Sequence, residues 1–203
     1  MRLRLASLFV LVAGAMSAHA NLIVNGSFED GNFVPNGDNT MSLAAGATDI
    51  TGWKVVNDPV AWIADPNPFN GWHATDGVKS LDLTGYGGGY GGVAQDIATI
   101  AGHQYHLEFD FGVHQAYGDA SVSVNVGTGD TGYTLHSENG VLWERILYDF
   151  TAFADTTTLS LIHNFDGGQG TGIDNVVLVE TVPEPATLSL LALAPLALRR
   201  RRK

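Results

Sequence analysis

The stretch that decides the fold is Gln104–Phe111, QYHLEFDF, in which polar and apolar residues alternate without a break. Successive side chains of a β-strand point to opposite faces, so one face would carry the tyrosine, leucine and phenylalanine side chains and the other the histidine and the two acids. A strand of this kind is buried on one face and solvated on the other, as in antiparallel sheets.

The same alternation recurs along the chain. The segment 120–126, ASVSVNV, has valines on its inner face and serines on its outer face, and TTLSLIH and GIDNVVLVE are similar but less regular. We expect further short strands at 22–24, 53–56, 60–63, 79–83, 132–136 and 145–150. Roughly ten strands, glycine-rich turns and the lack of a long amphipathic helix predict an all-β fold, an antiparallel jelly-roll β-sandwich.

One glycine-rich stretch has a second interpretation. In LTGYGGGYGGVAQDI, residues 83–97, Gly87, Gly89 and Gly92 match the G-x-G-x-x-G spacing of a dinucleotide-binding loop. Such a loop must lead into a helix, but only nine residues separate Gly92 from Gly102, and the β-branched residues among them favour an extended chain. We therefore expect a hairpin loop and no nucleotide cofactor.

Residues 1–20 predict a signal peptide. Arg2 and Arg4 precede an apolar run, and the small residues Ala18 and Ala20 suit cleavage. The segment has no polar face, which a helix of the folded domain would need. We expect export and a mature chain that begins at Asn21.

The C-terminal segment, residues 182–203, follows a single domain that we expect over residues 21–181. It opens with a proline–glutamate–proline triplet, Pro183, Glu184 and Pro185. An apolar run, Ala186–Leu198, and five basic residues follow, and the run is shorter than the ~20 residues of a free-standing membrane span. This tail resembles the PEP-CTERM sorting signal of Gram-negative bacteria that make extracellular polysaccharide. The resemblance implies transient anchoring in the inner membrane, cleavage by an exosortase and delivery to the cell surface or the biofilm matrix.

The charge of the body excludes some partners. Of the ten Lys and Arg residues only Lys54, Lys79 and Arg145 lie within residues 21–181, against twenty of the 21 acidic residues, so the formal charge there is about −17. Nucleic acids and anionic membrane surfaces need a basic face, so we expect neither as a partner. The chain has no cysteine, so no disulfide can brace the domain, and a bound cation is a candidate for that role.

Five short motifs follow one another along the body: NLIVNGSFEDG, ITGWKVV, WHATDGVKSLDLTG, GGVAQDIATIAGHQYHLEFDFG and GIDNVVLVE. In this order they resemble the choice-of-anchor C family of bacterial surface proteins, which is related to plant cell-wall proteins of unknown function with a galactose-binding-like fold. The resemblance implies a jelly-roll β-sandwich, binding of extracellular polysaccharide and no known catalysis.

Related carbohydrate-binding modules share this start, middle and end, and the resemblance to them implies a structural Ca²⁺ ion that joins the two ends of the domain. Its ligands would be the side chains of Glu29, Asp76 and Asp174 and the carbonyl groups of Ser27 and Lys79. A hard cation bound by oxygen atoms would also suit the acidic, cysteine-free body. In the alternative, Glu29 and Asp174 are solvated or accept hydrogen bonds from backbone amides.

Aromatic residues beside glycine, proline or polar residues are candidates for a sugar site, because the flat C–H face of a sugar packs on an aromatic ring. The candidates are Trp62, Phe69, Tyr86, Tyr90, Tyr117 and Trp143. Large aromatic residues also fill the core and close the ends of β-sandwiches, and we expect that role for Trp53 and Trp72.

No catalytic motif accompanies these residues, because the sequence contains no G-x-S-x-G, no H-E-x-x-H and no cysteine. His103 and His106 lie three residues apart, which places them on opposite faces of a strand. We therefore expect a non-catalytic exported protein that binds or organises extracellular polysaccharide. Two alternatives stay open: a purely structural or adhesive matrix protein without a sugar site, and a glycan-active enzyme that uses a pair of carboxylates.

Overall fold

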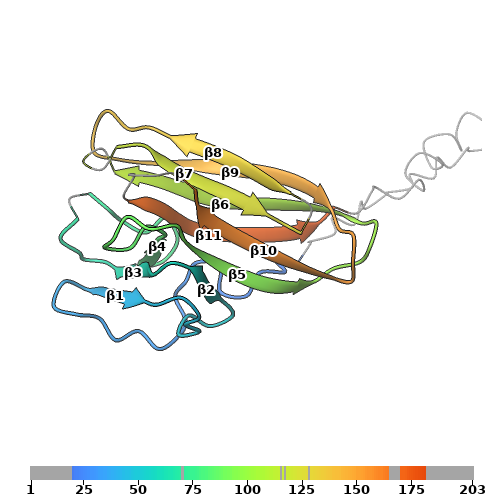
Figure 1. Ribbon diagram of the computed structural model, residues 1–203, viewed down its shortest axis with the longest axis horizontal. Coiled ribbons are helices and arrows are strands. Elements are labelled where there is room, and N and C mark those ends of the chain that lie inside the picture. Colours follow the sequence, from blue (N-terminus) through green and yellow to red (C-terminus); the bar gives the residue numbers. More distant parts are fainter. Residues whose placement is uncertain are drawn as a thin grey trace, which may run out of the picture.

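The computed structural model describes residues 20–69, 71–114, 116, 118–127, 129–164 and 170–181. They form two antiparallel sheets that pack face to face (Figure 1). The six-stranded sheet contains, in order across it, β1 (Thr40–Leu43), β3 (Val60–Ala64), β4 (Lys79–Asp82), β11 (Thr171–Glu180), β6 (Gln104–His114) and β9 (Val141–Thr151). The five-stranded sheet contains β2 (Lys54–Asn57), β5 (Gly91–Ala98), β10 (Thr156–His163), β7 (Ala120–Asn125) and β8 (Asp130–Leu135). This is the all-β jelly-roll sandwich that the alternation predicts.

The expected strands are present with two differences at the N-terminal side. Residues 22–24 do not form a strand: the Leu22 amide donates to the carbonyl of Leu178 at 2.8 Å, but the Val24 amide donates to the side-chain oxygen of Gln95 at 2.8 Å. The edge strand β1 was not expected, because its four residues are too few to show a period.

The core confirms the alternation in β6. Tyr105, Leu107, Phe109 and Phe111 are each no more than 1% exposed, and burying a large apolar side chain contributes about 1.5–3 kcal/mol. The valines of β7 are buried as expected. Its serines, Ser121 and Ser123, are buried as well, because the side chain of Asn164 covers them and hydrogen bonds to both hydroxyl groups.

The glycine-rich stretch is not a hairpin loop, so that expectation is wrong. It leads from β4 in the six-stranded sheet to β5 in the five-stranded sheet, and β5 pairs with β2 and β10. Alternation identifies a strand but not its partner, which is why the sequence could not show this crossing. The extended chain expected after the glycines is confirmed as β5. A Cβ atom at Gly91 would lie 2.3 Å from the carbonyl oxygen of Leu83, so the crossing closes tightly at its end.

Trp62, a candidate sugar-binding residue from the sequence, is completely buried in the core. Its indole N–H donates to the carbonyl of Phe28 at 2.9 Å, and its ring packs edge-on against Phe33 with the centroids 4.9 Å apart. The prediction for Trp62 is therefore wrong. All five residues of β3 are buried, so β3 lacks the polar face by which a sequence distinguishes an inward tryptophan from an outward one. Trp53 is buried, as expected, against Phe28.

Candidate functional site

The segment between β3 and β4, residues 65–78, covers part of the outer face of the six-stranded sheet. Trp72 in this segment is buried, and its indole N–H donates to the hydroxyl of Ser80 on β4 at 3.1 Å. It belongs to a small apolar cluster, separate from the main core, that contains Ala61, Ile63, Phe69, Trp72, Val141 and Trp143. This part of the sheet is therefore apolar on both faces.

Two glycines provide the room for the tryptophan rings. A Cβ atom at Gly172 would lie 2.7 Å from the ring of Trp143 and 2.8 Å from that of Trp72. Gly112, which pairs with Gly172 across β6 and β11, is equally close to Trp143, at 2.7 Å. Real Cβ atoms do not approach rings so closely, so a larger residue at either position would displace the pair of rings, whose centroids lie 5.3 Å apart.

The carboxylate of Asp174 ties the covering segment to β11. Asp174 is completely buried, and its Oδ2 accepts hydrogen bonds from the backbone amides of Thr75 and Asp76 at 2.6 and 3.0 Å. Its Oδ1 accepts a third, from the amide of Asn175 at 2.7 Å. Burial raises the pKa of Asp174 to about 6, and these amides, which favour the charged form, offset part of that rise.

Glu29 ties the last residues of the segment to the N-terminal part of the chain. Its Oε1 accepts the amides of Val78 and Lys79 at 2.7 and 2.6 Å. The ammonium group of Lys79 donates to the backbone carbonyl of Glu29 at 2.9 Å and lies 3.3 Å from Oε2. The C-terminal end of the segment is thus held by two carboxylates from distant parts of the sequence.

These hydrogen bonds bear on the predicted calcium site. The carboxylates of Glu29 and Asp174 are directed at N–H donors, and the ammonium group of Lys79 already supplies a positive charge beside Glu29. Asp76 is exposed, and its backbone amide, not its carboxylate, takes part. Within the described residues no three His, Cys, Asp or Glu side chains lie close enough together to hold a metal ion. In this arrangement Glu29 and Asp174 accept hydrogen bonds from backbone amides, which is the alternative that the sequence left open. Binding of a calcium ion by these residues, with the carbonyl groups of Ser27 and Lys79, stays a prediction.

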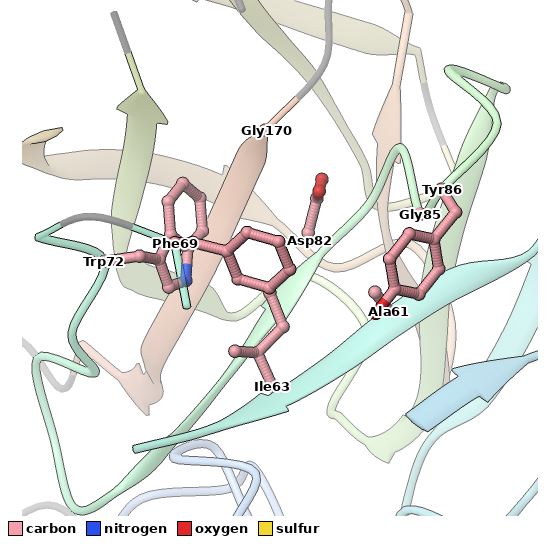
Figure 2. Close-up of a pocket in the computed structure, with 8 residues that line it drawn as sticks. All are labelled: Ala61, Ile63, Phe69, Trp72, Asp82, Gly85, Tyr86 and Gly170. Carbon is pink, nitrogen blue, oxygen red and sulfur yellow. The ribbon is translucent and has the colours of Figure 1, made fainter. Parts of the chain in front are cut away.

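A pocket of about 90 Å³ lies beside the Trp72 cluster on the outer face of the six-stranded sheet (Figure 2). Figure 2 shows Phe69 and Trp72 on one side of it and Tyr86 on the other, with the carboxylate of Asp82 between them. The full lining is Ala61, Ile63, Phe69, Trp72, Asp82, Gly85, Tyr86 and Gly170. Strands β3 and β4, the covering segment, the glycine-rich stretch and the residue before β11 all contribute.

Asp82 is the charged group of this pocket. Its Oδ1 accepts the amide and hydroxyl of Thr84 at 2.9 and 2.6 Å and the amide of Thr171 at 3.1 Å. Its Oδ2 has no hydrogen-bond donor among the described parts of the chain. Burial raises the pKa of Asp82 to about 6, although the three hydrogen bonds to Oδ1 act in the opposite direction. Among the described residues, Oδ2 is therefore left open to a donor from outside them.

Tyr86 forms the exposed wall of the pocket, with 55% of its surface accessible. Its hydroxyl group donates to Oδ2 of Asp38 at 3.2 Å and contacts the hydroxyl of Thr40 at the edge strand β1. The ring is thus held at its far end, while the rest of it remains available to a ligand.

The other aromatic candidates have different positions. Trp143 packs on Trp72 and does not line the pocket. Tyr90, within the glycine-rich stretch, is 41% exposed, with the centroid of its ring 6.4 Å from that of His163. Tyr117 lies outside the described residues. Trp72 is buried as expected, but in the outer cluster rather than the main core.

Asp82 was missed in the sequence, whereas Phe69 was among the aromatic candidates and lines the pocket. Asp82 lies between Leu81 and Leu83, both completely buried, so the alternation L-D-L could have placed it on the face opposite the core. Phe69, in the run PNPFNGW, carries no periodic signal. Its position depends on how the covering segment folds back over β3.

A wider groove of about 610 Å³ lies on the outer face of the five-stranded sheet, beside β2, β5 and β10. Its aromatic residue, Trp53, is only 3% exposed, and the side chain of Gln95 both accepts from and donates to the backbone of Val24, at 2.8 and 3.0 Å. This groove therefore offers neither an open ring nor an unpaired amide, and the pocket at Asp82 is the better candidate site.

The two terminal predictions concern residues that lie outside the described part of the chain. These are the signal peptide over residues 1–20, of which only residue 20 is described, and the sorting motif Pro183, Glu184 and Pro185. Within the described residues, no helix has the length and apolar character needed to cross a membrane.

The fold and the pocket define a jelly-roll β-sandwich domain with a lined site on one outer sheet face. Residues 21–178 match the family described as "Protein of unknown function (DUF642)", and the chain belongs to that family. Halomucin of Haloquadratum walsbyi is 31% identical over 177 residues, which are 85% of this chain but 2% of halomucin. The chain thus spans a very small part of that relative.

Solved structures with a similar fold have low sequence identity to this chain. The arabinose-bound α-L-arabinofuranosidase MgGH51 matches 82% of this chain over 27% of its own, with 15% identity and a TM-score of 0.51. The module TmCBM61, in complex with β-1,4-galactotriose, matches 80% of this chain over 99% of its own, with 17% identity and a TM-score of 0.45. At these identities the similarity concerns the fold alone.

Chelation tests the role of Glu29. If backbone amides and Lys79 satisfy its carboxylate, the melting temperature will be the same in Ca²⁺ and in EDTA. Glu29→Ala will lower the free energy of unfolding by about 1–3 kcal/mol, because two amides and an ammonium group lose their acceptor. Glu138→Ala, which removes an exposed acid, is the matched control and should change it by less than about 0.5 kcal/mol. A melting temperature that falls on chelation in the wild type but not in Glu29→Ala would instead establish the calcium site.

Proposed function

We propose that this domain is a non-catalytic module that binds extracellular polysaccharide in the pocket between Phe69 and Tyr86. The observation that carries the proposal is the combination of aromatic walls with one carboxylate oxygen, Oδ2 of Asp82, that lacks a donor within the described chain. An aromatic ring packs on the C–H face of a sugar, and a carboxylate accepts hydrogen bonds from its hydroxyl groups.

The size of the pocket limits what enters it. An apolar cavity of about 150 Å³ holds one benzene ring, so a pocket of about 90 Å³ takes one projecting sugar unit, or part of it, rather than several units in a row. We infer that the domain recognises an end or a branch of a polysaccharide chain, with the remainder lying on the exposed ring of Tyr86.

A catalytic role has weaker support. The carboxylates of Asp110 and Asp174 face each other across β6 and β11, and the hydroxyl of Thr75 lies 2.6 and 3.1 Å from them. A pair of carboxylates can hydrolyse glycosides, but Asp174 is completely buried beneath the covering segment and has no surface for a substrate. The proposal of a binding module without catalysis rests on this burial.

We also propose that the protein is exported, anchored transiently in the inner membrane and released by an exosortase to the cell surface or matrix. The support is the sequence of the two ends: the apolar leader, the Pro183–Pro185 triplet, the short apolar run and the basic cluster.

Loss of the aromatic walls will test sugar binding. On an array of bacterial and plant glycans, the purified full chain should bind a restricted set. Tyr86→Ala and Phe69→Ala should each weaken that binding by about tenfold or more in a titration, because a stacking surface is lost. Tyr90→Ala, which removes an exposed aromatic residue outside the pocket, is the control and should bind like the wild type. Absence of any binding would favour the adhesive alternative, and turnover of a glycan would favour an enzyme.

The mass of the mature protein tests sorting. Exosortase cleavage near Pro183–Pro185 predicts that protein extracted from the cell surface lacks residues 199–203, as measured by intact-mass spectrometry. Surface protein that retains this basic cluster would contradict the proposed processing and indicate a protein that stays anchored in the membrane.

A further inference from the structure

The carboxylate of Asp82 has no cationic partner in the described structure. Two of the three basic residues of the domain are engaged elsewhere: Lys79 lies 3.3 Å from the carboxylate of Glu29, and Arg145 lies 2.9 and 3.0 Å from those of Glu108 and Asp110. The third, Lys54, is on β2 in the other sheet. Asp82 is held instead by uncharged N–H and O–H donors, all on Oδ1.

The rest of the pocket offers few hydrogen bonds. Apart from Asp82, its side chains are aliphatic or aromatic, and the hydroxyl group of Tyr86 already contacts Asp38 and Thr40. A sugar unit with several hydroxyl groups would lose their hydration here and regain one acceptor, which is unfavourable. An ammonium group suits the lining better, because it brings donors and a positive charge to a carboxylate, and aromatic rings attract cations.

We propose that the pocket recognises the ammonium group of an amino sugar, so that the polysaccharide this domain binds carries amino-sugar units without N-acetyl groups. The ammonium group would donate to Oδ2 of Asp82 between the side chains of Phe69 and Tyr86. An N-acetyl group has no charge, and its carbonyl oxygen would meet the carboxylate, so acetylation should oppose binding. This inference rests on the proposed function, because it specifies the ligand of the same pocket.

The groups around Asp82 favour the same ligand. The residues paired with it on β3 and β11, Ala61 and Gly172, do not ionise. Several titratable groups lie on the surrounding elements. Tyr86 belongs to the glycine-rich stretch and contacts Asp38. Asp65 and His73 of the covering segment lie 3.3 Å apart, and Asp174 belongs to β11. Their carboxylates make the surroundings of the pocket negative, which attracts a cation and repels uronic acids and phosphorylated sugars.

The protonation of Asp82 gives the ligand a pH signature. Burial raises its pKa to about 6, so below that pH the neutral acid predominates and cannot pair with an ammonium group. Affinity for an amino sugar should therefore rise as the pH approaches and passes about 6 and fall again where the amine of the ligand loses its proton, while affinity for a neutral sugar should follow neither change. Asp174 has a raised pKa as well, but its carboxylate is directed at the amides of the covering segment and not at the pocket.

Titration of the full chain with three tetrasaccharides tests the proposal: fully deacetylated chitotetraose, its N-acetylated counterpart and the neutral cellotetraose. At about pH 6.5 and about 0.15 M salt, which screens bulk attraction between charges, the deacetylated form should bind about tenfold or more tighter than the other two. Asp82→Asn should abolish this preference and the pH dependence. Asp96→Asn, which removes an exposed carboxylate from β5 in the other sheet, is matched in charge and should change neither.

The outcomes separate this inference from the proposed function. Equal binding of the three tetrasaccharides, lost in Tyr86→Ala, would overturn the amino-sugar preference and leave the sugar site intact. Absence of binding to any glycan would overturn both. An equal loss of affinity in Asp96→Asn would show bulk attraction of a cation to an acidic protein and would also overturn the inference. If Asp82→Asn does not fold, the comparison of the deacetylated and acetylated ligands on the wild type decides alone.

Discussion

The carboxylate of Asp174 holds the segment between β3 and β4 on the outer face of the six-stranded sheet, and the pocket depends on that segment, which supplies Phe69 and Trp72. The cost of burying this carboxylate appears in its pKa, raised to about 6. Because the unfolded chain releases this proton near the ordinary value of 3.8, the folded state binds more protons between about pH 4 and pH 6. The contribution of Asp174 to stability therefore falls as the pH rises through that window and is constant above it.

Because the segment of residues 65–78 covers part of the six-stranded sheet, that part of the sheet is apolar on its outer face as well as on the face toward the core. On β3, Trp62 points into the sandwich, whereas Ala61 and Ile63 belong to the outer cluster. Gly172 allows Trp72 and Trp143 to lie directly on the strands. The result is an apolar surface beside Asp82, whose Oδ2 has no donor among the described residues. On the function proposed above, this combination suits the outer face to binding a ligand.

The sequence predicted the features that depend on neighbouring residues and missed those that depend on contacts between distant segments. The alternation of β6 predicted both its strand and its buried face, because one side of that strand is polar. The same reasoning failed for Trp62, since β3 is buried on both sides. Tyr86 and Phe69 were found from the glycine, proline and polar residues beside them, but Asp82 was not, because its role arises when β4 pairs with β11 and the covering segment folds back. The carboxylates of Glu29 and Asp174 were recognised as bracing residues, while their partners, backbone amides 49 to 99 residues away in the chain, leave no mark in the sequence.

The most direct test of this account locates the ligand on the protein. In a heteronuclear NMR titration of the full chain with an oligosaccharide that it binds, we predict that the largest shifts occur at the indole N–H of Trp72 and at the amides of Gly85, Tyr86 and Gly170. These groups belong to residues that line the pocket. Shifts confined to the groove of the five-stranded sheet, at Gln95, Asp96 and Thr158, would contradict the account, because they would place the sugar on the opposite side of the sandwich.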